Sequence, residues 1–394
     1  MGIAQDLRVA GRRWADVRRA RRAGVSASPT VAGETEREEL RQWFAGFRRQ
    51  DTAVHVRSVH LFEIEACELP WVDTGLDLDE GEWVTTIACG RVVLSDALDV
   101  WIGPQFQLWM RVGENSAIFN GTRDTTSFCA ASRGRFYLAN NFPGQWGDPN
   151  GRVSTSLADY EKYTGGITVA VIRWKGRAAD GLAALAGVID DGRWLVAERD
   201  RLREDVQPPA GWRYLWFLGR SEIFRSTSEN GHACIACHTH RTAGILQHDA
   251  VFDLTPKTRL RWAWKVDELP SLLPENTALS HDYLSVAVEF ENGRDITYTW
   301  SPELAVGTGY WCPLATWKDR EFHVVIRSGT TGLGAWLDEE RNLYDDYLQY
   351  MGEPPGRVVR IWLIAVSLFQ RRSGRASFRD FALEGGEGGR LELG

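Results

Sequence analysis

Two patterns of apolar residues follow one another along the chain. Near the amino terminus, Ile3, Leu7, Trp14 and Val17 recur every three or four positions, which predicts an amphipathic helix. A second helix is predicted over 35–47, where a Thr-x-x-Glu capping box precedes an apolar stripe. From about residue 54 the period changes to two, and short alternating segments bounded by turn residues indicate β-strands.

The alternating segments form two groups. Between 54 and 174 they recur without intervening helical patterns, as at 83–88 and 166–173, which is typical of an antiparallel sandwich. The second group occupies about 251–388 and is interrupted by one predicted helix at 334–350. Between the groups, 177–250 contains a short Ala/Leu-rich helix and two predicted strands, of which 194–197 is one.

These patterns predict a mainly β protein. It has two antiparallel β-sandwich or jelly-roll domains, a short α-helical N-terminus and a connecting segment that carries a Cys-x-x-Cys-His motif. A length of 394 residues favours about two to three domains. The predicted order is helices and linker at 1–52, a first sandwich at 53–176, the connecting segment at 177–250 and a jelly-roll domain at 251–394.

Charge and composition narrow the function classes. The chain has 46 basic and 53 acidic residues and a net charge of -7, which argues against a nucleic-acid partner. It has no apolar run long enough to predict a membrane span. The first helix is rich in arginine, so it is predicted either to lie on an anionic membrane surface or to pack on a neighbouring domain with its charges solvated.

The most specific motif is Cys234-Ile235-Ala236-Cys237-His238. This spacing is the attachment motif of c-type haem, with Cys234 and Cys237 forming thioethers and His238 binding the iron. His232 and His240 are candidate sixth ligands. The same cluster of cysteine and histidine also suits zinc, and a redox Cys-x-x-Cys pair or a chance pair of thiols are further alternatives.

The strands before this motif, with Trp212, Tyr214, Trp216 and Phe224, resemble the C-terminal part of β-type c-cytochromes whose haem is also cross-linked to lysine. That resemblance implies an aromatic strand pair beside a haem. Haem c is normally attached outside the cytoplasm, which implies a periplasmic or extracellular location. Residues 1–24 lack the apolar segment of a secretory signal, so a cytoplasmic location is the alternative.

A loop rich in Asn, Asp, Gly and Pro at 140–151 offers hard oxygen ligands for calcium, or forms an ordinary Asx-rich turn. With the segments 71–75, 79–82 and 108–113, it resembles the calcium-dependent galactose-binding lectin of the LecA type. The likeness covers about 54–175. It implies a lectin sandwich in which Asn141, Asp148 and the carbonyl of Gln145 are candidate calcium ligands.

The last region is similar to the bacterial domain-of-unknown-function family 3047. The matching pieces are Leu-Arg-Trp-Ala-Trp-Lys-Val-Asp at 260–267, Tyr-Thr-Trp at 298–300, and the segments 325–329 and 340–347. The resemblance implies a jelly roll and brings no activity with it. Asp267, Arg327 and Arg341 are predicted either to line a groove there or to form ordinary ion pairs.

Three functions are compatible with these features. The first is a haem protein for electron transfer or small-molecule redox chemistry at the Cys-Ile-Ala-Cys-His motif. The second is a non-catalytic carbohydrate-binding protein whose Cys/His cluster holds zinc or nothing. The third is a cytoplasmic pathway enzyme that uses the groove of the last domain. The predicted partner is therefore a small molecule or a carbohydrate, and common hydrolase and nucleotide-binding motifs are lacking.

Overall fold

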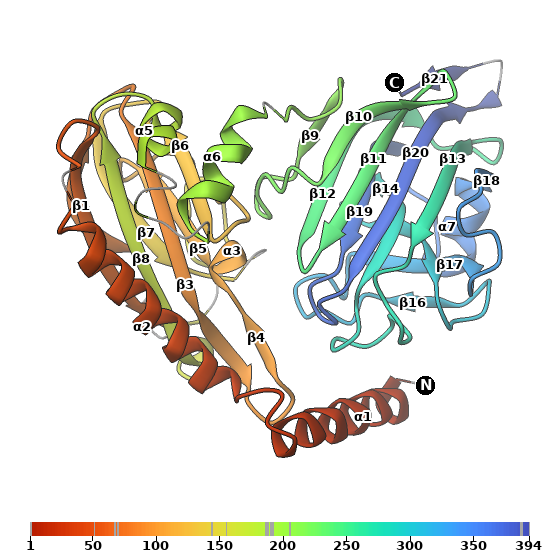
Figure 1. Cartoon of the computed structure of the whole chain (residues 1–394). Helices are drawn as coiled ribbons and strands as arrows, with labels where there is room; N and C mark the ends of the chain where they lie inside the picture. The colour runs from red at the N-terminus through yellow and green to blue at the C-terminus, as the bar shows by residue number, and fades with distance from the viewer. Residues whose placement is uncertain are drawn as a thin grey trace. The chain divides into compact units, whose positions relative to one another are not determined.

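The computed structural model describes residues 2–50, 52–66, 68, 71–142, 145–154, 156–185, 189, 193–204, 206–386 and 389–393. The chain divides into two compact units (Figure 1). The N-terminal unit contains Arg12–Asp205 and Trp216–Arg220. The C-terminal unit contains Val206–Leu215 and Ser221–Gly394, together with Met1–Gly11. Each unit is mainly β, which confirms the predicted fold class.

Two long helices begin the chain, α1 (Gly2–Arg22) and α2 (Pro29–Phe47). The side chain of Ser28 caps α2 by accepting a hydrogen bond from the N–H of Val31, and Pro29 occupies the first helical position. The helix therefore begins before the predicted capping box. Thr35 lies inside the helix, where its hydroxyl donates to the carbonyl of Val31.

The N-terminal unit contains two antiparallel sheets. The larger has the order β1-β8-β3-β4, with β6 also paired to β3, and the smaller has the order β2-β7-β5. The strands of the larger sheet are β1 (Val56–Glu65), β3 (Trp83–Ser95), β4 (Val100–Ile102), β6 (Thr125–Cys129) and β8 (Thr164–Trp174). Those of the smaller sheet are β2 (Val72–Leu78), β5 (Leu108–Val112) and β7 (Gly134–Asn140).

Each face of the larger sheet has its own core. Val84 and Val169 pack towards the smaller sheet, whereas Ile87 and Ala170 pack against helices on the opposite face. The covering helices are α2, α5 (Ala178–Leu185) and α6 (Leu195–Arg203), and the unit also contains α3 (Pro104–Gln107) and α4 (Leu157–Tyr160). The unit is therefore a sandwich with a third, helical layer.

The C-terminal unit is a sandwich of two larger sheets. One has the order β10-β11-β20-β13-β18 with β21 paired to β20, and the other has the order β16-β17-β15-β14-β19-β12-β9. The first contains β10 (Phe224–Glu229), β11 (His232–His240), β13 (Arg259–Glu268), β18 (Leu337–Asn342), β20 (Ser373–Glu384) and β21 (Arg390–Glu392). The second contains β9 (Trp212–Tyr214), β12 (Ala243–Asp253), β14 (Tyr283–Phe290), β15 (Asp295–Ser301), β16 (Gly309–Trp311), β17 (Glu321–Ser328) and β19 (Arg357–Val366).

The apolar core of the C-terminal unit packs against only one face of the seven-stranded sheet. Phe322 and Val324 of β17 pack into this core, so Glu321 and His323 project from the opposite face of the sheet. Every residue of β14 and β15 is buried, so that opposite face is covered as well. Glu275, in the connection before β14, and Cys312, in the connection after β16, are buried as well.

Some predicted boundaries differ from the structure. The segment 177–250 is divided between the units, since α5 and α6 pack on the N-terminal sandwich while β9–β12 join the C-terminal sheets. Residues 195–197 are helical rather than extended. The predicted helix at 334–350 begins only at α7 (Leu343–Met351), where Asn342 caps it, because residues 337–342 pair with β13. No helix in the described part of the chain is long and apolar enough to span a membrane.

Candidate metal centre

The Cys-x-x-Cys-His motif lies on strand β11, not on a helix. Ile235 and Cys237 pack into the core, so alternation along the strand directs Cys234 and His238 to the opposite face. Because the two sulfurs lie on opposite faces of a sheet, β11 cannot present both to one porphyrin. The structure therefore gives no support to covalent haem at Cys234 and Cys237 or to iron binding by His238.

The zinc alternative at this motif is not supported either. His232, His238 and His240 are exposed on β11, and among the described residues they belong to no group that brings three potential ligand atoms close together. The Nδ1 atom of His240 lies 2.7 Å from the hydroxyl of Ser373. Cys237 is fully packed, and burial raises the pKa of its thiol.

The predicted calcium ligands of the N-terminal unit are engaged with protein groups. The hydroxyl of Tyr160 contacts the side-chain oxygens of both Asn141 and Gln145. The backbone carbonyl of Gln145 accepts from the hydroxyl of Ser154 at 2.8 Å. Asp148 accepts from two backbone N–H groups and pairs with Arg152 at 3.2 Å. A guanidinium thus supplies the positive charge at this loop.

The three residues suspected of lining a groove separate in the structure. Arg327 pairs with Glu339 at 2.7 Å, and Arg341 pairs with Asp346 at 2.5 Å. These two arginines form ordinary ion pairs, as the alternative predicted. Asp267 does line a groove, beside His238.

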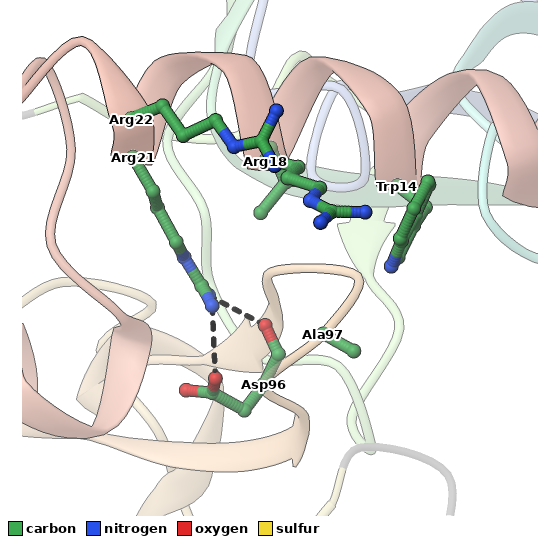
Figure 2. A pocket seen from close by; sticks show the side chains of 7 residues that line it. Trp14, Arg18, Arg21, Arg22, Asp96 and Ala97 are labelled. Atoms are coloured by element: carbon green, nitrogen blue, oxygen red, sulfur yellow. Dashed lines mark hydrogen bonds and ion pairs between the residues drawn. The ribbon is translucent and has the colours of Figure 1, made fainter.

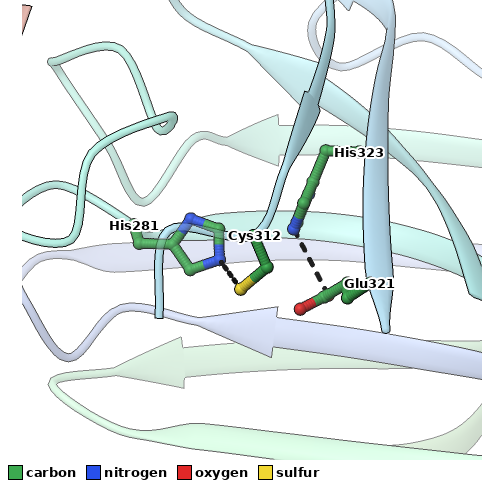
Figure 3. Close-up of side chains that lie close together, drawn as sticks. All are labelled: His281, Cys312, Glu321 and His323. Atoms are coloured by element: carbon green, nitrogen blue, oxygen red, sulfur yellow. Dashed lines mark hydrogen bonds and ion pairs between the residues drawn. The ribbon is translucent and has the colours of Figure 1, made fainter. Parts of the chain in front are cut away.

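A different group of side chains has the features of a metal centre. One potential ligand atom from each of His281, Cys312, Glu321 and His323 lies within 4.8 Å of all the others, and all four residues are buried. Among the residues that the structure describes, no other group of three or more His, Cys, Asp or Glu side chains brings its ligand atoms close enough to hold an ion. Figure 3 shows His281 facing Cys312 while His323 points towards Glu321.

The four ligand atoms come from three separate segments. His281 lies directly before β14, Cys312 follows β16, and Glu321 and His323 lie two residues apart on β17. The Nε2 atom of His281 is 3.3 Å from the Sγ of Cys312, and the Nε2 of His323 is 3.4 Å from the Oε1 of Glu321. Ligands on a tetrahedral zinc ion are about 3.3–3.8 Å apart, so these two pairs already have the required spacing.

Surrounding groups orient two of the four side chains. The Nδ1 of His281 lies 2.7 Å from the carbonyl oxygen of Glu275, which fixes the proton on Nδ1 and leaves Nε2 free as a ligand. Glu321 accepts a hydrogen bond from the hydroxyl of Tyr283 at 2.9 Å. Such outer contacts are typical of histidine and carboxylate ligands in metal sites.

His323 is the least satisfied residue of the group. It is fully buried, its ring stacks on Tyr310 at 4.8 Å, and neither ring nitrogen has a hydrogen-bond partner. The contact with Glu321 has the distance of an ion pair but not the geometry of a hydrogen bond. A buried donor or acceptor without a partner costs about 1–3 kcal/mol, so a metal ligand would resolve this cost.

Burial determines the protonation of the centre. Burial, and then the nearby His323, lower the pKa of His281 to about 3, so its imidazole is neutral at physiological pH. Burial raises the pKa of Cys312. Burial alone would raise the pKa of Glu321, but the neighbouring imidazoles lower it below its usual range. The group therefore contains a neutral imidazole and a carboxylate in a dry environment.

The pair His281 and Cys312 also resembles a nucleophile and its base. A reactive thiol needs a lowered pKa and access to its substrate. Cys312 is 1% exposed and its pKa is raised, so the arrangement suits metal binding better than nucleophilic catalysis.

Sequence reasoning missed this centre. The only local signal is Glu-Phe-His at 321–323, because a spacing of two places both polar side chains on one face of a strand. Cys312 stands alone in the sequence, and His281 is separated from it by three strands and their connections.

Comparison with known proteins bears on the predicted resemblances. Residues 210–382 match a family model described as a protein of unknown function, DUF3047. This confirms the predicted resemblance of the last region and extends it back to include β9–β12. No curated protein matches the chain.

Several solved structures match the chain, all at low sequence identity. The N-terminal domain of EclA, a PllA-like lectin, is 17% identical, covers 29% of this chain and 94% of its own, and has a TM-score of 0.23. A family 30 carbohydrate-binding module of a Clostridium thermocellum cellulosomal cellulase is 11% identical, with coverages of 46% and 95% and a TM-score of 0.28. The tandem CBM22 domains of Paenibacillus barcinonensis Xyn10C are 9% identical, with coverages of 84% and 92% and a TM-score of 0.25.

These structural neighbours are therefore lectins and carbohydrate-binding modules. Likenesses this distant carry no information on what the present chain binds. They give no support to the predicted resemblance to c-type cytochromes.

Proposed function

We propose that the C-terminal unit binds one zinc ion through His281, Cys312, Glu321 and His323. The observation that carries this proposal is the convergence of four buried ligand atoms within 4.8 Å of one another. Two imidazoles, a thiolate and a carboxylate form a donor set typical of zinc. Calcium and magnesium prefer sites made only of oxygen, so this set disfavours them.

Charge balance supports a divalent ion. A thiolate at Cys312 and a carboxylate at Glu321 carry two negative charges, while the two imidazoles are neutral ligands. A divalent cation neutralises the whole group, which removes the cost of burying single charges in the protein interior.

The number of ligands favours a structural role. Catalytic zinc sites usually keep one position open, whereas structural sites have four protein ligands. Here four side chains can supply all four ligands, and they would join the segments before β14 and after β16 to the sheet through β17. We expect zinc to fix these connections over the polar face of the seven-stranded sheet.

Metal analysis of the purified full-length chain tests this proposal. We expect about one zinc per chain after dialysis, and a near-ultraviolet charge-transfer band when cobalt replaces zinc, because the Cys312 thiolate would bind the cobalt ion. Cys312→Ser should abolish this band and His323→Leu should abolish zinc binding. Cys89→Ser, which changes a buried thiol in the other unit, is the matched control. Equal zinc content in all variants would contradict the assignment.

Carbohydrate binding is a second candidate, supported by a groove on the outer face of the six-stranded sheet. Its volume is about 520 Å³. The polar side chains lining it are Glu222, Arg225, His238, Asp267, Arg375 and Ser377. Sugar hydroxyls donate and accept hydrogen bonds, so a lining that offers both donors and acceptors suits them.

Glycan-array screening and titration calorimetry test the second candidate. His238→Ala should weaken binding of a selected glycan, whereas His232→Ala should not, because His232 is exposed on the same strand but does not line the groove. Binding that responds equally to both substitutions would place the glycan elsewhere. Loss of zinc would leave this result unchanged if the two sites are independent.

A further inference from the structure

The C-terminal half of α1 forms one wall of a shallow groove in the N-terminal unit. The groove has a volume of about 510 Å³, and its other wall is the connection between β3 and β4. Figure 2 shows it from close by. The residues that line it are Trp14, Val17, Arg18, Arg21, Arg22, Asp96 and Ala97.

Two arginines attach α1 to the β3–β4 connection. The Nε of Arg13 donates to the carbonyl of Leu98 at 2.7 Å, and Arg21 pairs with the Asp96 carboxylate at 3.0 Å. Arg21 also donates to the Asp96 carbonyl at 2.6 Å. These contacts hold the helix in place and account for the roles of Arg13 and Arg21.

Of the remaining arginines in the last turns of this helix, Arg19 pairs with Asp16 on the same helix, whereas Arg18 and Arg22 are left for other partners. Arg18 lies over the ring of Trp14, with its guanidinium carbon 4.9 Å from the ring centre, and Trp14 is 45% exposed. In the part of the chain that the structure describes, Arg18 and Arg22 have no acidic partner within ion-pair distance. An exposed tryptophan therefore lies among unpaired arginines.

The charge of the helix contrasts with that of the rest of the protein. Helix α1 contains seven arginines and two aspartates, a formal charge of +5 in a chain with a net charge of -7. A helix that only packs on its own protein has no need of such an excess, and its buried side already uses Arg13 and Arg21. The excess points to a negatively charged partner outside the chain.

We propose that Trp14, Arg18 and Arg22 dock the protein on the surface of an anionic phospholipid bilayer. The guanidinium groups of Arg18 and Arg22 pair with lipid phosphates, which arginine contacts well because of its planar donor geometry. Trp14 inserts at the level of the headgroups, where an amphipathic ring is stabilised. The complementary charge and the interfacial tryptophan together favour a bilayer over a soluble acidic protein.

Vesicle co-sedimentation of the full-length chain tests this surface. We expect binding to phosphatidylcholine vesicles that contain phosphatidylserine and much weaker binding to phosphatidylcholine alone. Each arginine near an anionic surface strengthens binding by about fivefold, so Arg18→Gln with Arg22→Gln should weaken it about 25-fold. Trp14→Ser should also weaken binding without changing the charge. Arg133→Gln with Arg203→Gln removes two exposed arginines elsewhere and should have little effect.

Three results would overturn the proposal. One is equal loss of binding in the two double variants, which would indicate attraction by net charge alone. Another is unchanged binding of Trp14→Ser. The third is binding to RNA or inorganic polyphosphate in place of vesicles, which would assign the groove to a different anion. Far-UV circular dichroism of each variant confirms that the helix is retained.

Discussion

Substitution of His323 gives opposite results depending on whether the centre holds zinc. The change His323→Leu keeps the volume of the side chain and removes both ring nitrogens, neither of which has a hydrogen-bond partner. In the metal-free protein it removes buried polar atoms that each cost about 1–3 kcal/mol, while it loses a ring stacking on Tyr310 worth about 0.5–1.5 kcal/mol. The metal-free variant should therefore be as stable as the parent or more stable.

With zinc bound, the sign reverses. A metal present at a thousand times its dissociation constant adds about 4 kcal/mol to the free energy of unfolding. His323→Leu removes one of four ligands and should lose most of this contribution. The expected pattern is therefore a loss of about 4 kcal/mol in zinc and a loss near zero, or a gain, in a strong chelator.

Urea unfolding followed by fluorescence, with and without zinc, measures both free energies. Because the chain has two units, the transition that responds to zinc is the one to compare. Ser285→Ala is the matched control, since Ser285 is buried on the same face of the sheet and its hydroxyl has no partner either. Its effect should be the same in both conditions. A zinc-independent effect of His323→Leu would refute the reasoning.

Three further predictions concern the rest of the chain. Cys237→Ser should lower the free energy of unfolding by about 1–3 kcal/mol, because a hydroxyl replaces a thiol in the core. Cys234→Ser should lower it less, because Cys234 lies on the opposite face of β11. Equal losses in thermal melts would contradict this placement of the two sulfurs. The Nε of Arg173 donates to the buried Glu82 carboxylate at 2.7 Å. Burial alone would raise the pKa of Glu82, but Arg173 and the N–H of Asp79 lower it overall. The contribution of this ion pair to the free energy of unfolding is therefore present above a pH of about 4.3 and is lost as the pH falls below that value. Glu82→Gln should flatten the acid branch of a plot of stability against pH, and an unchanged branch would assign it to other carboxylates. Calcium should leave the melting temperature of the parent protein unchanged but raise that of Arg152→Ala, because Asp148 then no longer pairs with the Arg152 guanidinium. A rise in the parent protein would show that Arg152 does not prevent calcium from binding to the loop.

Local sequence patterns determined much of the fold. Alternation predicted the strands of both sandwiches, since a half-buried strand needs apolar residues at every second position. The amphipathic periodicity predicted α1 and α2 for the same kind of reason. These patterns depend on neighbouring residues, so they can be read without knowing which strand pairs with which.

The candidate site depended on tertiary structure. The spacing of Cys234, Cys237 and His238 is suited to haem only if those residues leave the sheet, and pairing of β11 with β10 and β20 keeps them in a strand. Pairing with β13 likewise extends residues 337–342, although their pattern is helical.

The proposed zinc ligands were hidden for a related reason. His281, Cys312 and β17 are far apart in the sequence and meet only because β16 pairs with β17 and the connection before β14 folds over the sheet. A sequence shows local periodicity and short motifs. Long-range strand pairing, which is determined by the packing of the whole core, decided which side chains share the buried polar site.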